Sequence, residues 1–367
     1  MSVHNEIIDA HVSLMTGDDG EAGAGLTDWL NGYAASVEGE LIPCDLLLGY
    51  NIKPPNWTMA RTGTYSTSRV PHQFSTGRGP GVWSSLHAFQ TCQFLWWIMQ
   101  TDSTPTSEGD PGVGYNTHTL SIGLTNTPKW NGIHFEREGI TSNELRYDLY
   151  GLLPSDLTIN CGQSANWKAT QEITIPYAFL KRDASDITAQ TPRPVGTTGS
   201  LWKDWMNLIT GNGGGAAPSG LKYDSAQLEV DVINMSLKFH RDIYFGPGSA
   251  SSTANQRGTP LTGMMLGWDY SIVLDVIPIG DLLYTVNNTK QEDYSNNLAF
   301  EFYFTGEATN DKIKFTYDTL YMLPFDELND YNKYIEGYTI TLVPYDKAST
   351  FVCVGIDNLD NTHFENP

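Results

Sequence analysis

Basic residues are scarce in this sequence. Its 367 residues include 21 Lys and Arg against 42 Asp and Glu, which gives a formal net charge of −21. Such a chain should be repelled by phosphate backbones and by anionic membrane surfaces, which argues against tight nucleic-acid binding. Repulsion would also suit a channel through which DNA slides without adsorbing to the wall. High solubility and a halophilic source are simpler explanations of the same charge.

Cysteine is also scarce. The four cysteines, Cys44, Cys92, Cys161 and Cys353, lie far apart and form no C-x-x-C pair. This spacing provides neither a zinc site nor a thioredoxin-type redox motif. We expect reduced and mostly buried thiols, in a chain long enough to fold without disulfides.

Long apolar runs are missing. No stretch reaches the ~18 apolar residues that a membrane span needs. The longest aromatic-rich run, Phe94 to Met99, has six residues. Near the N-terminus, Glu6 and Asp9 stand where a signal peptide would carry basic residues before an apolar block. The sequence therefore predicts no membrane span, and synthesis and assembly in a cytoplasm.

Motifs for catalysis or metal binding are missing as well. The histidines form no H-E-x-x-H or H-x-H arrangement; His118 and His134 lie in strand-like segments, and His240 has no second imidazole nearby in the sequence. No serine lies in G-x-S-x-G. Adjacent acids such as Asp18 and Asp19 are expected by chance at this composition. We therefore predict no enzyme, no cofactor and no metal. The abundant acids, Trp and Tyr leave open a carbohydrate-binding or carbohydrate-cleaving β-protein.

Strand patterns dominate what is present. Side chains of opposite character alternate with a period of two in many short segments separated by turn residues, as in sandwiches and barrels. The clearest alternation sets Phe300, Phe302 and Phe304 against their polar neighbours. The predicted strands are 118–125, 132–137, 144–152, 156–161, 172–177, 227–239, 268–277, 298–304, 312–322 and 338–343.

Two segments are more helix-like. Apolar residues in Leu86 to Met99 recur at helical spacing, which predicts a helix there. Pro324 to Tyr334 is the other helix-like piece. A long loop, a hairpin, a helix-sized insert and closing strands occur in both halves, which hints at a duplicated domain, although residue identity between the halves is too low to establish a repeat.

The order of these pieces, from about residue 50 to about residue 345, resembles the tail tube proteins of long-tailed bacterial and archaeal viruses. The best-matching parts are HTLSIGLTNTPKWNGIHFEREGITSNELRYDLYGL, which leads to DLTINCG, and the later LAFEFYFTG and KIKFTYDTLYML. The resemblance implies a mainly β protein with two tube-type β-sandwich or β-barrel domains, each with one short helix. The expected divisions are an N-terminal arm (1–50), a first domain (51–190), a Gly/Pro-rich linker or insertion (191–222), a second domain (223–346) and a C-terminal tail (347–367).

The resemblance also implies a function. Tail tube proteins are structural virion proteins that close into hexameric rings, or into trimeric rings with pseudo-sixfold symmetry, and the rings stack around a channel for genome delivery. The expected partners are other copies, other tail proteins and viral DNA in transit, and the expected location is the virion tail. A tail terminator, hub or capsid protein is the related alternative. The candidate lumen-facing or ring-forming residues lie on two predicted strands: Glu301, Tyr303, Thr305, Lys314, Thr316 and Asp318.

Overall fold

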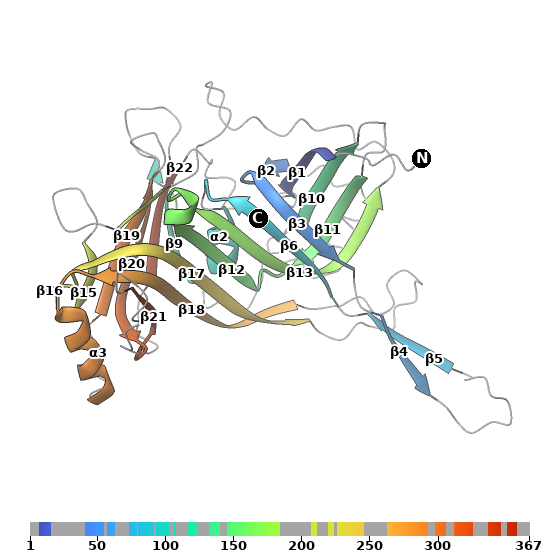
Figure 1. Ribbon diagram of the computed structural model, residues 1–367. Coiled ribbons are helices and arrows are strands. Elements are labelled where there is room, and N and C mark those ends of the chain that lie inside the picture. The colour runs from blue at the N-terminus through green and yellow to red at the C-terminus, as the bar shows by residue number, and fades with distance from the viewer. Residues whose placement is uncertain are drawn as a thin grey trace, which may run out of the picture.

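The computed structural model is mainly β (Figure 1). It describes residues 7–15, 41–54, 57–62, 73–78, 80–91, 93–102, 106–107, 116–122, 132–139, 145–183, 207–210, 219–223, 226–245, 263–292, 298–305, 312–325, 337–345 and 351–357. Nearly all of the strands join one sheet, and every pairing in it is antiparallel. The mainly β fold class expected from the alternating pattern is confirmed.

The first half of the chain contributes six strands that pair in the order β3–β6–β13–β11–β10–β1. Their bounds are β1 Ile7–Met15, β3 Leu47–Lys53, β6 Gly81–Ala88, β10 Gly132–Gly139, β11 Leu145–Leu152 and β13 Thr170–Asp183. The helix α2, Gln93–Met99, lies between β6 and β10 in the sequence.

The second half pairs in the order β17–β18–β21–β20–β19, followed by β15 and β14 beside β19. Its strands are β14 Asn207–Ile209, β15 Gly220–Tyr223, β17 Val230–Phe245, β18 Gly263–Pro278, β19 Leu298–Thr305, β20 Lys312–Met322 and β21 Tyr338–Pro344. The helix α3, Leu282–Glu292, lies between β18 and β19.

The same order of elements and pairings thus occurs twice along the chain. In both halves, a hairpin is followed by a helix, a second hairpin, and a strand that returns between the two hairpins. Backbone hydrogen bonds also correspond. Leu153 N donates to Pro176 O just after β11, at 3.0 Å, and Leu323 N donates to Thr341 O just after β20, at 2.9 Å.

Two further strands join the halves. The strand β12, Asp156–Gly162, lies between β13 and β17 and pairs with both. The strand β22, Phe351–Asp357, lies between β20 and β9, Asn116–Ile122. In Figure 1, β13, β12, β17 and β18 run side by side from one half to the other. The division expected at 191–222 stays a prediction, but any two units would share one continuous sheet.

The remaining strands are short. The hairpin of β4, Trp57–Thr62, and β5, Gln73–Arg78, forms a separate two-stranded sheet that projects from the body (Figure 1). The strand β2, Leu41–Pro43, pairs with β1, while β7, Gln100–Asp102, and β8, Thr106–Ser107, pair with β9. The last pieces are β16, Ala226–Gln227, beside β15, and the short 3-10 helix η1, Gln163–Ala165.

The helix prediction for 86–99 was wrong at its start. Residues 81–88 form β6, in which Trp83, Ser85 and His87 are buried while Leu86 is exposed, so the period there is two. The helix begins only at Gln93. The helix α3 was missed, and most of the expected helix at 324–334 lies outside the described residues. Among the described residues, no helix is long and apolar enough to span a membrane.

Three expected connecting segments contribute to the sheet. Residues 7–15 of the expected N-terminal arm form β1, and its residues 47–50 form the first part of β3. Residues 207–209 and 220–223, at the expected linker, pair with β19. Residues 351–357 of the expected tail form β22. These segments can leave water because each forms its backbone hydrogen bonds with a strand distant in sequence.

The core lies on the inner faces of the strands and is rich in aromatic rings. On β19, Phe300, Phe302 and Phe304 are all buried, as the alternation predicts. Phe302 stacks on Phe315 of β20, with ring centroids 5.0 Å apart. Large buried rings of this kind contribute much of the hydrophobic free energy of a domain.

Candidate functional site

The outer face of the joining sheet carries a row of small polar and acidic side chains that crosses both halves. Residues opposite each other on neighbouring strands share a face. Following the pairs from β3 through β6, β13, β12 and β17 to β18 gives the row Asn51, Ser84, Thr174, Asp156, His240 and Asp269.

A second row runs parallel to the first, two residues further along each strand. From β13 to β18 it contains Glu172, Thr158, Lys238 and Ser271. All ten side chains are exposed or half-buried. We call these ten residues the polar face. Three of the ten are carboxylates and one is a lysine, so this set of residues is hydrophilic and acidic. On β6, the second row continues to Leu86, which is opposite Glu172 and exposed.

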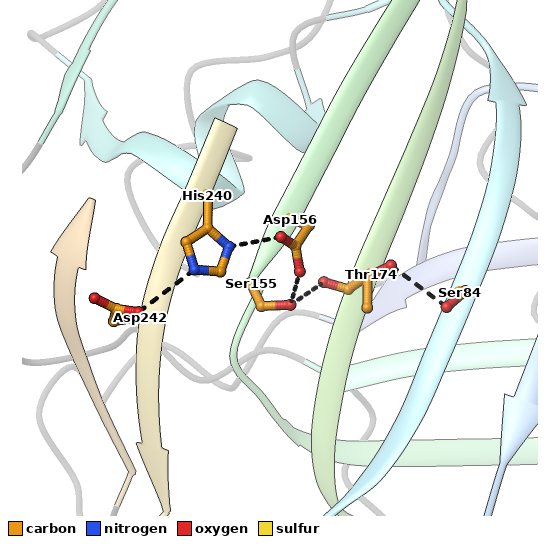
Figure 2. Close-up of polar contacts among 6 residues, drawn as sticks. All are labelled: Ser84, Ser155, Asp156, Thr174, His240 and Asp242. Carbon is orange, nitrogen blue, oxygen red and sulfur yellow. Dashed lines mark hydrogen bonds and ion pairs between the residues drawn. The ribbon is translucent and has the colours of Figure 1, made fainter. Parts of the chain in front are cut away.

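His240 lies at the centre of the polar face, where the two halves meet (Figure 2). Its Nδ1 is 2.6 Å from Asp156 Oδ1, and its Nε2 is 3.4 Å from Asp242 Oδ1. Asp156 belongs to β12 and His240 to β17, so the shorter of these two contacts connects the first half to the second. The imidazole and the Asp156 carboxylate are each about half exposed, at 54% and 48%.

The carboxylates shift the titration of the imidazole. The hydrogen bond with Asp156 raises the pKa of His240 above its ordinary value of 6.5, partial burial opposes this increase, and Asp242 adds to it. Protonated His240 can donate from both ring nitrogens and so satisfy both carboxylates. The polar face therefore becomes more negative as the pH rises through this pKa.

Ser155, beside this histidine, is not arranged as a catalytic nucleophile. Its hydroxyl lies 2.6 Å from Asp156 Oδ2 and 3.2 Å from Thr174 O, both acceptors (Figure 2). A Ser-His-Asp triad needs the serine hydroxyl on the imidazole, which then takes its proton. Here the imidazole is directed to two carboxylates instead. The geometry fits a structural polar cluster at the junction.

A second polar network is buried beneath β3 and β6. The carboxylate of Asp45 accepts hydrogen bonds from Gln90 N and Thr91 N at 3.0 Å, from Thr91 Oγ1 at 2.8 Å and from Gln171 Nε2 at 2.6 Å. Asp45 is 5% exposed. It therefore fixes the chain just before α2 to the strand β13, which carries Gln171.

His87 belongs to the same buried network. Its Nδ1 lies 2.8 Å from Asp45 O, which can only accept, so Nδ1 carries the proton. Its Nε2 then accepts from Ser85 Oγ at 2.8 Å, and Ser85 Oγ accepts from Trp83 Nε1 at 2.9 Å. Burial lowers the pKa of His87 from 6.5 to about 4, against an opposing effect of the hydrogen bond to Asp45. The side chain is neutral at physiological pH.

The six residues singled out from the sequence lie on β19 and β20. Glu301 Oε2 is 2.8 Å from Lys314 Nζ, and Tyr303 is directly opposite Lys314 in the pairing. Tyr303 is buried, and its ring lies 3.5 Å from Lys312 Nζ. Thr305 and Thr316 are half-buried, and Asp318 is exposed.

Burial would raise the pKa of Glu301, but hydrogen bonds from Lys314 and from the Ser219 backbone outweigh it and lower the pKa. The charges of Lys312 and Lys314 balance those of Glu301 and Asp318, so this part of β19 and β20 is less acidic than the polar face. Over 312–317, β20 has β19 on one side and β22 on the other, so another chain could not pair with it there.

Sequence reasoning missed the polar face because its members come from strands far apart in the chain. Asp156 and His240 are separated by 84 residues, and only the sheet register places them together. One short sequence repeat indicates that the two halves correspond near this site. Leu153-Pro154-x-Asp156 after β11 recurs as Leu323-Pro324-x-Asp326 after β20.

Cys44, Cys161 and Cys353 are buried and form no disulfide, as expected. Burial raises the pKa of Cys161 to about 11, so its reactive thiolate is scarce at neutral pH. No group of His, Cys, Asp and Glu side chains that could hold a metal ion occurs among the described residues.

A scan against protein-family models finds no match for the chain, and a search of the curated proteins finds no similar sequence.

Proposed function

We propose that the protein is a structural virion protein that forms a viral tail tube, with the polar face lining the channel. The polar face is the observation that carries the proposal: its first row crosses both halves of the chain, and its ten residues are hydrophilic and carry more acids than lysines. A wall of this kind offers DNA few cations to bind.

The repeated order of pairings supports the two tube-type domains that the resemblance implies. In each half, one helix follows the first hairpin, as expected for a tube-type domain with one short helix. A chain with two such units would give a ring of six units from three copies, or of twelve from six. Since successive units within the chain already share a sheet through β12 and β17, the same mode of association can extend from copy to copy.

The projecting hairpin of β4 and β5 supports stacking of rings. An isolated two-stranded hairpin is at best marginally stable in water. In the proposed tube it would reach an adjacent ring and gain contacts there. The candidate residues of β19 and β20 are not members of the polar face.

Light scattering and negative-stain electron microscopy of the purified chain test the proposal. Tubes or stacked rings with a central hole support it. A shell would favour a capsid protein, and a monomer that binds or cleaves glycans would favour the carbohydrate alternative. Either result would overturn the tail tube.

The channel role has a separate test on assembled particles. Replacing the exposed acids in Glu172→Lys and Asp269→Lys reverses two charges on the polar face. Tubes of this double variant should retain DNA in a filter-binding assay at low salt, whereas wild-type tubes should not. Equal retention by both would contradict the assignment of the polar face to the channel.

A further inference from the structure

The edge of β3 differs from the corresponding edge of the second half. The strand β17, which holds the same place as β3, has β18 on one side and β12 on the other. Within the described part of the chain, β3 forms strand pairs with β6 alone, and β1 lies near it without pairing. A strand edge with free N–H and C=O groups is a template for pairing with another chain.

The two strands correspond in their pairing with the second strand of each hairpin. Ala88 N donates to Leu46 O at 2.9 Å after the first hairpin, and Ile279 N donates to Glu229 O at 2.9 Å after the second. The first strand of each hairpin is irregular: β3 between Leu47 and Gly49, and β17 between Val232 and Asn234 and again between Arg241 and Ile243. Because the strands correspond, the pairing of β12 with β17 shows what kind of partner strand β3 lacks.

Equivalent side chains of the two strands are buried to different extents, in line with the difference in pairing. Ile52 of β3 is opposite Trp83, and Met235 of β17 is opposite Leu274, which is the equivalent position. Met235 is buried at 2% exposure, whereas Ile52 is only half-buried. A strand beside β3 would complete the burial of Ile52, as β12 helps to bury Met235.

Three leucines at the start of β3 and on the neighbouring β6 are exposed. Leu46, Leu48 and Leu86 are exposed at 38%, 42% and 37%. The exposed members of the polar face are instead polar or charged: Asn51, Glu172, Lys238, His240 and Asp269. Clustered exposed leucines beside an open strand edge indicate a protein contact rather than a solvated rim.

We propose that the edge of β3 binds a second copy of this chain, and that it receives the second half of that copy as β17 receives the first half within one chain. This inference rests on the proposed function, because it names the contact that closes the tube ring. The partner is a second copy because the chain already contains this junction once. The contact uses different surfaces on the two copies, so it forms a ring or an open filament rather than an isolated dimer. The rows of the polar face then continue across the copies.

The test compares two doubly charged variants by light scattering over a range of protein concentrations. Leu48→Lys/Asn51→Lys places two charges on β3, and lysines on an edge strand oppose pairing. Ile279→Lys/Asn288→Lys is the matched control, with the same added charge on exposed positions at and before α3. The β3 variant should need at least ~10-fold more protein to associate, and the control less than ~2-fold more, with circular dichroism spectra like that of the wild type.

Hydrogen exchange separates this inference from the proposed function. The amides of residues 47–53 should exchange much more slowly in assembled protein than in dilute monomer. If tubes form while these amides stay unprotected, or if the β3 variant assembles like the wild type, the β3 contact is wrong and the tail tube stands. Equal impairment of both variants would also overturn the β3 contact. A chain that stays monomeric at every concentration would overturn both proposals.

Discussion

The buried imidazole of His87 should make the folded protein sensitive to mild acid. Unfolding exposes His87, whose pKa returns to about 6.5, whereas in the folded protein burial lowers the pKa to about 4. Between these values the unfolded chain binds a proton that the folded chain does not. The free energy of unfolding therefore falls as the pH is lowered from 6.5 toward 4, and the contribution of His87 is fully present only above 6.5.

The size of the effect follows from the same two pKa values. The folded protein binds this proton ~300-fold more weakly than the unfolded chain, which corresponds to about 3 kcal/mol at ~1.4 kcal/mol per tenfold. That is a large share of the ~5–15 kcal/mol by which folded proteins are stable. Since the many carboxylates titrate in the same range, the wild type alone cannot isolate the contribution.

A comparison with His87→Asn isolates it. The asparagine amide can still donate near the position of Nδ1 to Asp45 O, but it does not titrate. Denaturant unfolding of both proteins at several pH values between about 7.5 and 4.5 gives their stability difference at each pH. The advantage of the wild type should shrink by about 2–3 kcal/mol over that range. A difference that is constant to within ~0.5 kcal/mol would refute the assignment of a buried neutral imidazole.

Three further variants test other contacts. Asp45→Asn should lower the free energy of unfolding by about 2–4 kcal/mol in denaturant unfolding, because a side-chain amide group would face backbone and side-chain donors. An unchanged unfolding midpoint would contradict the buried network around Asp45. Gly162→Ala should cost about 1–3 kcal/mol in the same assay, because the added Cβ meets the side-chain oxygen of Asn234 at the β12–β17 junction; a neutral effect would mean that this side chain moves freely. In His240→Asn, the loss of thermal stability relative to the wild type should be largest below pH 6.5, because only the charged imidazole is stabilised by the carboxylates. The loss should shrink as the pH rises through the raised pKa. A loss that grows with pH would contradict the raised pKa of His240.

Strands with clear alternation were predictable from the sequence. The sequence pattern placed β19 and β20 almost to the residue, because buried aromatic side chains alternate there with polar ones. It failed at residues 81–88, where Leu86 points outward and mimics a helical spacing. It also missed β22, since the short apolar run 351–357 is a strand only by virtue of its neighbours β20 and β9.

The candidate site was less predictable than the fold. Local patterns indicate which side chains alternate, but not which strands become neighbours. The carboxylate partner of His240, Asp156, could be found only from the register of β12 on β17. Likewise, the repeated Leu-Pro-x-Asp segments gain meaning only when both are seen to follow corresponding strands.

The most direct measurement is an electron cryo-microscopy reconstruction of the assembled protein. The account predicts a closed ring with the polar face turned inward, in which β3 of each copy lies beside the second half of its neighbour and every unit continues the same sheet. A tube with the polar face on its outer surface, or a ring with solvent along the edge of β3, would contradict it.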